Sequence, residues 1–82
     1  MGEVELLPKH ISDQHIRAQI YERIHTRLKL DAEGIEVEVQ GGRAVLRGRV
    51  ASFDEKLQIA KIAETVQGVR AVIDELTAPE AP

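Results

Sequence analysis

A run of alternating apolar and charged residues, broken by two adjacent glycines, constrains the fold of this chain more than any other feature. The run reads IEVEVQGGRAVLRGRV over residues 35–50, and its alternation is typical of strands with one buried face. Gly41 and Gly42 fit a two-residue hairpin turn, because glycine adopts the positive φ that such turns need. The resulting register places small and apolar residues together on one face. The expected pairs are Gln40 with Arg43, Val39 with Ala44, Val37 with Leu46, and Ile35 with Gly48.

The other face of this hairpin carries most of its charge. Glu36 lies directly across from Arg47 in the expected register, and Glu38 lies diagonal to it, so part of the positive charge is neutralised in place. Guanidinium groups bind phosphates well, and Val45 adds an apolar contact between them. The candidate residues for contact with a lipid or another partner are Arg43, Arg47 and Arg49. The alternative is a solvated sheet face with weak exposed ion pairs.

The residues before the hairpin predict an amphipathic helix. It begins at Ser12 or Asp13, either of which suits an N-cap, and its apolar residues recur every four positions. The helix ends through residues 31–34, where Gly34 can adopt positive φ. The apolar stripe consists of Ile16, Ile20, Ile24 and Leu28. The arginines that we interpret as a solvated face of this helix are Arg17, Arg23 and Arg27.

A second amphipathic helix is expected after the hairpin. SFDE at residues 52–55 has the form of a capping box, in which Ser52 accepts from the Glu55 amide and the Glu55 side chain reaches back. The helix continues until Gly68, since glycine commonly ends helices. Its apolar stripe comprises Leu57, Ile59, Ala60, Ile62, Ala63 and Val66. We interpret Gly48 of the hairpin as a packing glycine at which a helix approaches the sheet closely.

A third strand is expected over residues 69–76, which makes the order of elements α, β, β, α, β. A right-handed crossover makes this strand parallel to the second, and a sheet order of 1-2-3 leaves the arginine strand central. The predicted fold class is therefore α+β, a two-layer αββαβ sandwich with a three-stranded mixed sheet and two helices on one face. We expect a flexible lead over residues 1–11, a folded domain over 12–76 and a disordered tail over 77–82. A short strand within Val4–Leu7 is the alternative for the lead.

The composition limits the class of protein. The 82 residues suffice for one small domain, and 43% hydrophobic residues with only Tyr21 and Phe53 as aromatics predict an aliphatic core. A formal net charge of −3 argues against attraction of the whole domain to nucleic acid or an anionic membrane, so any such contact is local. The absence of cysteine excludes disulfides and thiolate metal sites. No stretch has the roughly 20 apolar residues of a membrane span, so we expect peripheral membrane contact at most.

The residue patterns do not indicate catalysis or a cofactor. The paired glycines lie in a hairpin, whereas a phosphate loop joins a strand to a helix N-terminus. Nucleic-acid binding is not expected, because only two aromatic residues are available for base stacking. The histidines His10, His15 and His25 lack carboxylates at metal-ligand spacing. Ser12 and Ser52 are better used as helix caps, so the sequence predicts no enzyme, no metal and no cofactor.

The order and spacing of these segments resemble the BON domain family, small bacterial domains of αββαβ order. The resemblance covers residues 12–76 and rests on SDQHIRAQI in the first helix, IEVEVQGGRAVLRGRVAS in the hairpin and AETVQGVRAVIDEL at the end. In the last segment, Gly68 and Val69 followed by Val72 and Leu76 look like the closing motif of the family. The resemblance implies a non-enzymatic module that binds phospholipid membranes or other envelope components, with a role in stress response.

Two functions of different classes follow. The first, from the resemblance and the arginine strand, is docking on an anionic phospholipid membrane or an envelope component through a basic sheet face. The alternative is a protein-interaction or self-assembly domain that pairs through the exposed edges of its sheet. MGEVELLPKH lacks the basic start and apolar core of a signal peptide, which predicts a cytoplasmic location, with a periplasmic one as the alternative for a fragment of an exported protein. The pattern leaves the oligomeric state open.

Overall fold

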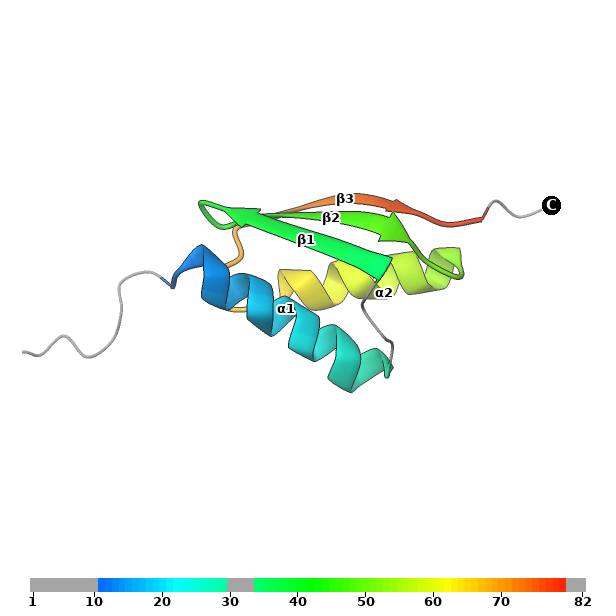
Figure 1. Cartoon of the computed structure of the whole chain (residues 1–82), viewed down its shortest axis with the longest axis horizontal. Helices are drawn as coiled ribbons and strands as arrows, with labels where there is room; N and C mark the ends of the chain where they lie inside the picture. Colours follow the sequence, from blue (N-terminus) through cyan, green and yellow to red (C-terminus); the bar gives the residue numbers. More distant parts are fainter. Residues whose placement is uncertain (1–10, 30–33, 80–82) are drawn as a thin grey trace, which may run out of the picture.

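The computed structural model of the chain describes residues 11–29 and 34–79. Both helices lie against the same face of a three-stranded sheet, and the other face is open (Figure 1). The predicted class, an α+β two-layer sandwich of αββαβ order, is confirmed. The elements are α1 (Asp13–Leu28), β1 (Ile35–Gln40), β2 (Arg43–Arg49), α2 (Phe53–Glu64) and β3 (Ala71–Thr77). The alternative strand within Val4–Leu7 lies outside the described residues.

The hairpin of β1 and β2 has the register that the alternating pattern predicts. Gly41 and Gly42 form its two-residue turn, with φ of 60° and 86°. Gln40 pairs with Arg43 next to this turn, and β3 adds to the other side of β2 in the parallel direction. Since a slip of one residue would turn every apolar side chain of a strand toward solvent, the apolar pattern of the hairpin favours this single register.

The core between the sheet and the helices is aliphatic. Among the described residues no polar or charged side chain is buried, and Tyr21 only packs against the core margin. Leu57, predicted within the apolar stripe of α2, is instead 46% exposed. It lies two residues from Ile59, about 200° around the helix, and so faces away from the sheet. The buried residues are Ile16, Ile20, Ile24, Ile35, Val37, Ala44, Leu46, Val50, Ile59, Ile62, Ala63, Val66 and Leu76.

Both helices begin at serine caps, as the sequence predicts. The Ser12 hydroxyl accepts a hydrogen bond from the His15 amide at 3.1 Å. The Ser52 hydroxyl accepts one from the Glu55 amide, also at 3.1 Å. The Glu55 carboxylate reaches back to the amide of Ala51 at 2.8 Å, one residue earlier than a standard capping box requires. These caps satisfy backbone donors that have no partner within a helix.

The ends of the helices differ from the predicted ones. The left-handed conformation that ends α1 belongs to Lys29, with φ of 55°, rather than to Gly34. Helix α2 ends at Glu64, before Gly68 is reached. The hydroxyl of Thr65 donates to a carbonyl of the last turn at 2.7 Å, a local bond that competes with continuation of the helix.

Strand β3 begins and ends later than the predicted range of 69–76. At its start, the amide of Arg70 donates to the carbonyl oxygen of Gly42 at 2.7 Å, so this part of the chain serves as the connection to the hairpin turn. At its end, the carbonyl oxygen of Thr77 accepts from the Val50 amide at 2.9 Å. Thr77 therefore belongs to the sheet and not to the expected disordered tail.

Polar residues of α1 bind the outer edge of β1. Arg17 and Tyr21 lie four residues apart and therefore share one side of the helix. The Arg17 Nε donates to the Val37 carbonyl at 2.9 Å. The Tyr21 hydroxyl donates to the Ile35 carbonyl at 2.9 Å and accepts from the Val37 amide at 3.0 Å. These contacts satisfy backbone groups that an edge strand would otherwise present to other chains.

The opposite edge strand, β3, is held by one carboxylate. Asp74 forms an ion pair with Lys56 of α2 at 2.9 Å, and the two side chains are only 23% and 21% exposed. Its other oxygen accepts from the Leu76 amide at 3.0 Å. The Thr77 carbonyl points toward the β2 side, where it accepts from the Val50 amide. Backbone groups of successive residues in a strand point to opposite sides, so the Leu76 amide points outward. Asp74 thus joins α2 to β3 and covers one outward amide.

Candidate functional site

Figure 1 shows that no helix covers one face of the sheet. All three candidate arginines lie on this face, because they alternate along β2 with the buried Ala44 and Leu46. On this open sheet face Val45 and Ile73 are side by side in the β2–β3 register and half buried. The parallel register also brings Glu75 beside Arg47. The face therefore carries three arginines and three glutamates, and its formal charges balance. The sequence predicts a basic face, and this is not what the structure has. The open sheet face comprises Glu36, Glu38, Gln40, Arg43, Val45, Arg47, Arg49, Ala71, Ile73, Glu75 and Thr77.

Arg47 is bound on both sides by carboxylates. Its guanidinium lies 3.1 Å from Glu38 Oε1 and 3.0 Å from Glu75 Oε1. The hydrogen bond with Glu38, followed by that with Glu75, raises the pKa of Arg47 above its usual value. The directly opposite Glu36, expected as a partner, has no ion pair among the described residues. Arg47 is consequently the candidate arginine with the fewest donors left for a ligand.

Arg43 and Arg49 differ from Arg47 in their surroundings. Both are exposed, and within residues 11–29 and 34–79 neither has an ion-pair partner. They stand at opposite ends of β2, about 20 Å apart along the strand. A shallow groove of about 210 Å³ adjoins Arg43 and includes Val45 in its lining. These two guanidinium groups are free to bind an anion.

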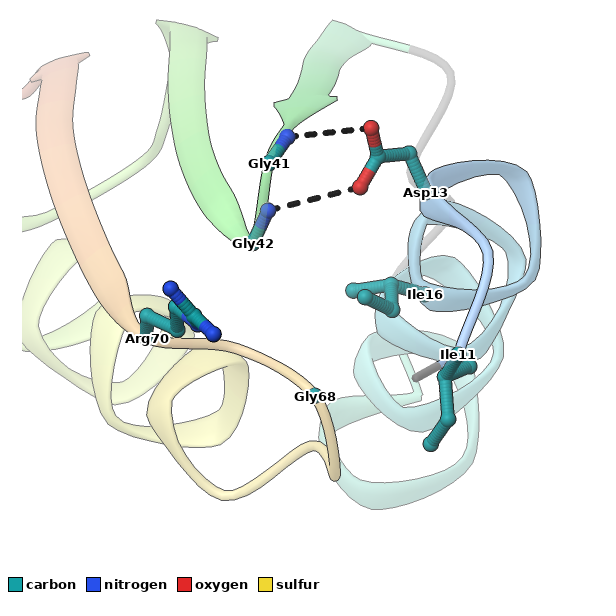
Figure 2. Close-up of a pocket in the computed structure, with 7 residues that line it drawn as sticks. All are labelled: Ile11, Asp13, Ile16, Gly41, Gly42, Gly68 and Arg70. Atoms are coloured by element: carbon teal, nitrogen blue, oxygen red, sulfur yellow. Dashed lines mark hydrogen bonds between the residues drawn. The ribbon is translucent and has the colours of Figure 1, made fainter. Parts of the chain in front are cut away.

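A larger groove lies at the hairpin end of the molecule, where the start of α1, the hairpin turn and the α2–β3 connection meet (Figure 2). We call it the hairpin-end groove. The Asp13 carboxylate holds the turn against α1, because it accepts from the Gly41 amide at 3.0 Å and the Gly42 amide at 3.3 Å. The groove has a volume of about 400 Å³. Its lining residues are Ile11, Asp13, Ile16, Gly41, Gly42, Gly68 and Arg70.

Glycines allow the segments around this groove to approach each other. A Cβ on Gly42 would lie 3.0 Å from the Gly68 carbonyl oxygen, and a Cβ on Gly68 would lie 2.8 Å from the Ile16 side chain. Gly48, expected to accommodate a helix, has a different neighbour. A Cβ there would overlap the carbonyl oxygen of Gly34, at the start of β1. The crowding at Gly48 therefore comes from the paired strand within the sheet.

Sequence reasoning missed the side chains that join α1 to the hairpin. Arg17, interpreted as part of a solvated face, donates to the β1 backbone and lies 5.2 Å from the ring of Tyr21. Asp13 was considered only as a helix cap. Asp13 and Arg17 lie four residues apart, on the helix side next to the isoleucine stripe. This spacing is the signal in the sequence that could have indicated their contacts with the hairpin. Arg70 was not singled out, because only the fold brings it to the hairpin turn.

The described residues include surface grooves but no cluster of metal-ligating side chains. Within residues 11–29 and 34–79, no three His, Cys, Asp or Glu side chains gather in a way that would hold a metal ion. His15 is exposed on α1, and His10 lies outside the described residues. Neither helix in the described part of the chain is long and apolar enough to cross a membrane.

The described residues form a small two-layer α+β sandwich with one open sheet face, which defines the structural class of the domain. Comparison with protein families makes the assignment specific, because the model of the BON domain family matches residues 12–80. The chain belongs to the BON domain family. BON domains are generally non-catalytic binding domains. A comparison with curated proteins gives no match.

Proposed function

We propose that this BON domain is a non-catalytic module that docks on anionic phospholipid through Arg43 and Arg49 of the open sheet face. The observation that carries the proposal is the exposure of two guanidinium groups without ion-pair partners among the described residues. Guanidinium forms paired hydrogen bonds with phosphate oxygens. Val45 and Ile73 lie between the two arginines and supply an apolar contact for the lipid interface.

The charge balance of the open sheet face sets the strength of this docking. Because Glu38 and Glu75 occupy Arg47, only the outer two arginines add attraction for phosphate. The chain as a whole has a formal net charge of −3, so long-range attraction to an anionic surface is absent. We therefore expect weak binding that salt disrupts, because exposed charges are screened beyond about 8 Å at physiological ionic strength.

Self-assembly through the β1 edge of the sheet has less support. Arg17 and Tyr21 already bond the outward groups of β1 at Ile35 and Val37. An incoming strand would have to break these bonds before it could pair with β1.

Co-sedimentation with vesicles tests the docking proposal. We expect the wild type to bind phosphatidylglycerol vesicles at low salt and to bind them more weakly at physiological salt. We expect no binding to neutral phosphatidylcholine vesicles. The Arg43→Ala/Arg49→Ala variant is expected to lose most of this binding, since it removes both free guanidinium groups.

The matched control removes the same charge from the helical layer. Arg27→Ala/Lys61→Ala replaces exposed residues of α1 and α2, far from the open sheet face. It should keep most of the wild-type binding. Equal losses in both double variants would show a response to net charge alone, and an absence of wild-type binding at low salt would refute the proposal.

A further inference from the structure

The hairpin-end groove combines charge and apolar surface in a way that the open sheet face does not. One wall holds the Arg70 guanidinium, and the facing wall holds the Asp13 carboxylate (Figure 2). Ile11 and Ile16 lie on the same α1 side of the groove as Asp13, across from Gly68 and Arg70, and make that side apolar (Figure 2). Its volume of about 400 Å³ falls within the range of small-ligand sites.

Arg70 is available to a ligand. It is exposed, and in the described part of the chain its side chain has neither an ion pair nor a hydrogen bond. Its backbone amide is fixed by the 2.7 Å bond to the Gly42 carbonyl, which holds the base of the side chain beside the groove. A carboxylate suits a guanidinium with free donors, because the two groups form a pair of parallel hydrogen bonds.

Asp13 determines what else the ligand must carry. Each of its oxygens accepts one glycine amide of the hairpin turn, and each retains a lone pair. The Asp13 carboxylate therefore repels a ligand of high negative charge and can accept a hydrogen bond from an N–H group of the ligand. The isoleucines beside Asp13 favour an aliphatic group on the ligand, next to the N–H that binds Asp13.

We propose that the hairpin-end groove binds an aliphatic amino-acid unit with a free carboxylate. The carboxylate binds Arg70, the nitrogen of the unit donates to Asp13, and the side chain packs on Ile11 and Ile16. Both a free amino acid and the last residue of a peptide present this combination. Inorganic phosphate matches Arg70 alone and leaves the apolar side unused.

This site is separate from the proposed lipid contact. Its charged residues are Asp13 and Arg70, whereas docking relies on Arg43 and Arg49 of the open sheet face. A negative result for phospholipid binding would therefore leave the proposal for the hairpin-end groove unaffected, and the reverse also holds.

Titration of the ¹⁵N-labelled chain followed by amide NMR tests the groove. The probes are leucine, N-acetyl-leucine, leucinamide and inorganic phosphate. We expect saturable shifts of the Gly41, Gly42 and Gly68 amides with leucine or N-acetyl-leucine. Leucinamide, which lacks the carboxylate, should bind roughly tenfold more weakly or worse, because a charged hydrogen-bonded contact is lost. Tighter binding of N-acetyl-leucine identifies a peptide end, and tighter binding of leucine identifies a free amino acid.

A pair of charge-matched variants locates the binding. Arg70→Ala should weaken N-acetyl-leucine binding by about tenfold while it keeps the backbone bond to Gly42. Arg27→Ala removes an equal charge from the last turn of α1, away from the groove, and should leave the affinity unchanged. Three results would overturn the proposal: no saturable shift with either acid in the wild type, equal affinity for leucinamide, or equal affinity for phosphate. The probe series needs no variant, so it remains decisive even if Arg70→Ala is unstable.

Discussion

The two edges of the sheet are protected in different ways. The edge of β1 is bonded by Arg17 and Tyr21, which are fixed side chains of a packed helix. The edge of β3 relies on Asp74, which binds both Lys56 and the Leu76 amide. The first edge is therefore part of the tertiary structure, whereas protection of the second depends on a single carboxylate.

This difference shows that position in a sheet does not decide whether an edge is open to another chain. Both β1 and β3 are outer strands. What distinguishes them is whether a neighbouring helix presents donors and acceptors toward the outward backbone groups. The contrast predicts a loss of stability when the β1 edge is altered and a gain of self-association when the β3 edge is altered.

The largest loss of stability is expected for Tyr21→Phe. The substitution keeps the ring and removes the hydroxyl, which leaves the Ile35 carbonyl and the Val37 amide without their partner. We expect the free energy of unfolding to fall by about 2 kcal/mol, because partly buried polar groups lose their hydrogen bonds. Urea unfolding measures this change as a lower midpoint with an unchanged slope. Glu22→Gln, an exposed change on the same helix, is the control; if both variants unfold at the wild-type midpoint, the hydroxyl bridge has no stabilising role.

A smaller loss, combined with self-association, is expected for Asp74→Ala. It removes the Lys56 ion pair and uncovers the Leu76 amide, at a cost of about 1 kcal/mol. Asp74→Asn separates the two effects, because its amide oxygen still accepts from Leu76 while the charge is lost. Sedimentation velocity at rising concentration should show association of the alanine variant alone. Association of both variants, or of neither, would contradict the role given to the β3 edge.

The smallest effect on stability is expected for Arg47→Ala. Its ion pairs with Glu38 and Glu75 cross all three strands, but its side chain is 44% exposed and its partners are more so. Exposed pairs of this kind are screened by water and add little. The urea midpoint should match that of the wild type within experimental error. A clear drop in the midpoint would mean that cross-strand pairs on the open sheet face help to hold the sheet together.

The fold was predictable because its main determinants are local in sequence. The alternation on either side of Gly41 and Gly42 determines the hairpin register without reference to other segments. Ser52 and Glu55 likewise mark the start of α2 within four consecutive residues. Leu57 was misplaced because an apolar residue was counted into a stripe without its angle around the helix.

The candidate site was less predictable because its contacts join distant segments. The pairing of Arg47 with Glu75 depends on the parallel register that the α2 crossover produces, so the balanced charge of the open sheet face escaped the sequence analysis. Asp13 and Arg70 come together only because α1 and the α2–β3 connection both meet the hairpin turn. Side-chain types alone do not reveal such a meeting point.

The bond from the Arg70 amide to the Gly42 carbonyl has a consequence for biosynthesis. The hairpin turn leaves the ribosome before α2 and β3, so its carbonyl has no partner on the nascent chain until the last strand emerges. Parallel pairing of β2 with β3 must also wait for the complete crossover. The sheet is therefore completed, and Arg70 reaches the hairpin-end groove, only after residues 70–77 have been synthesised.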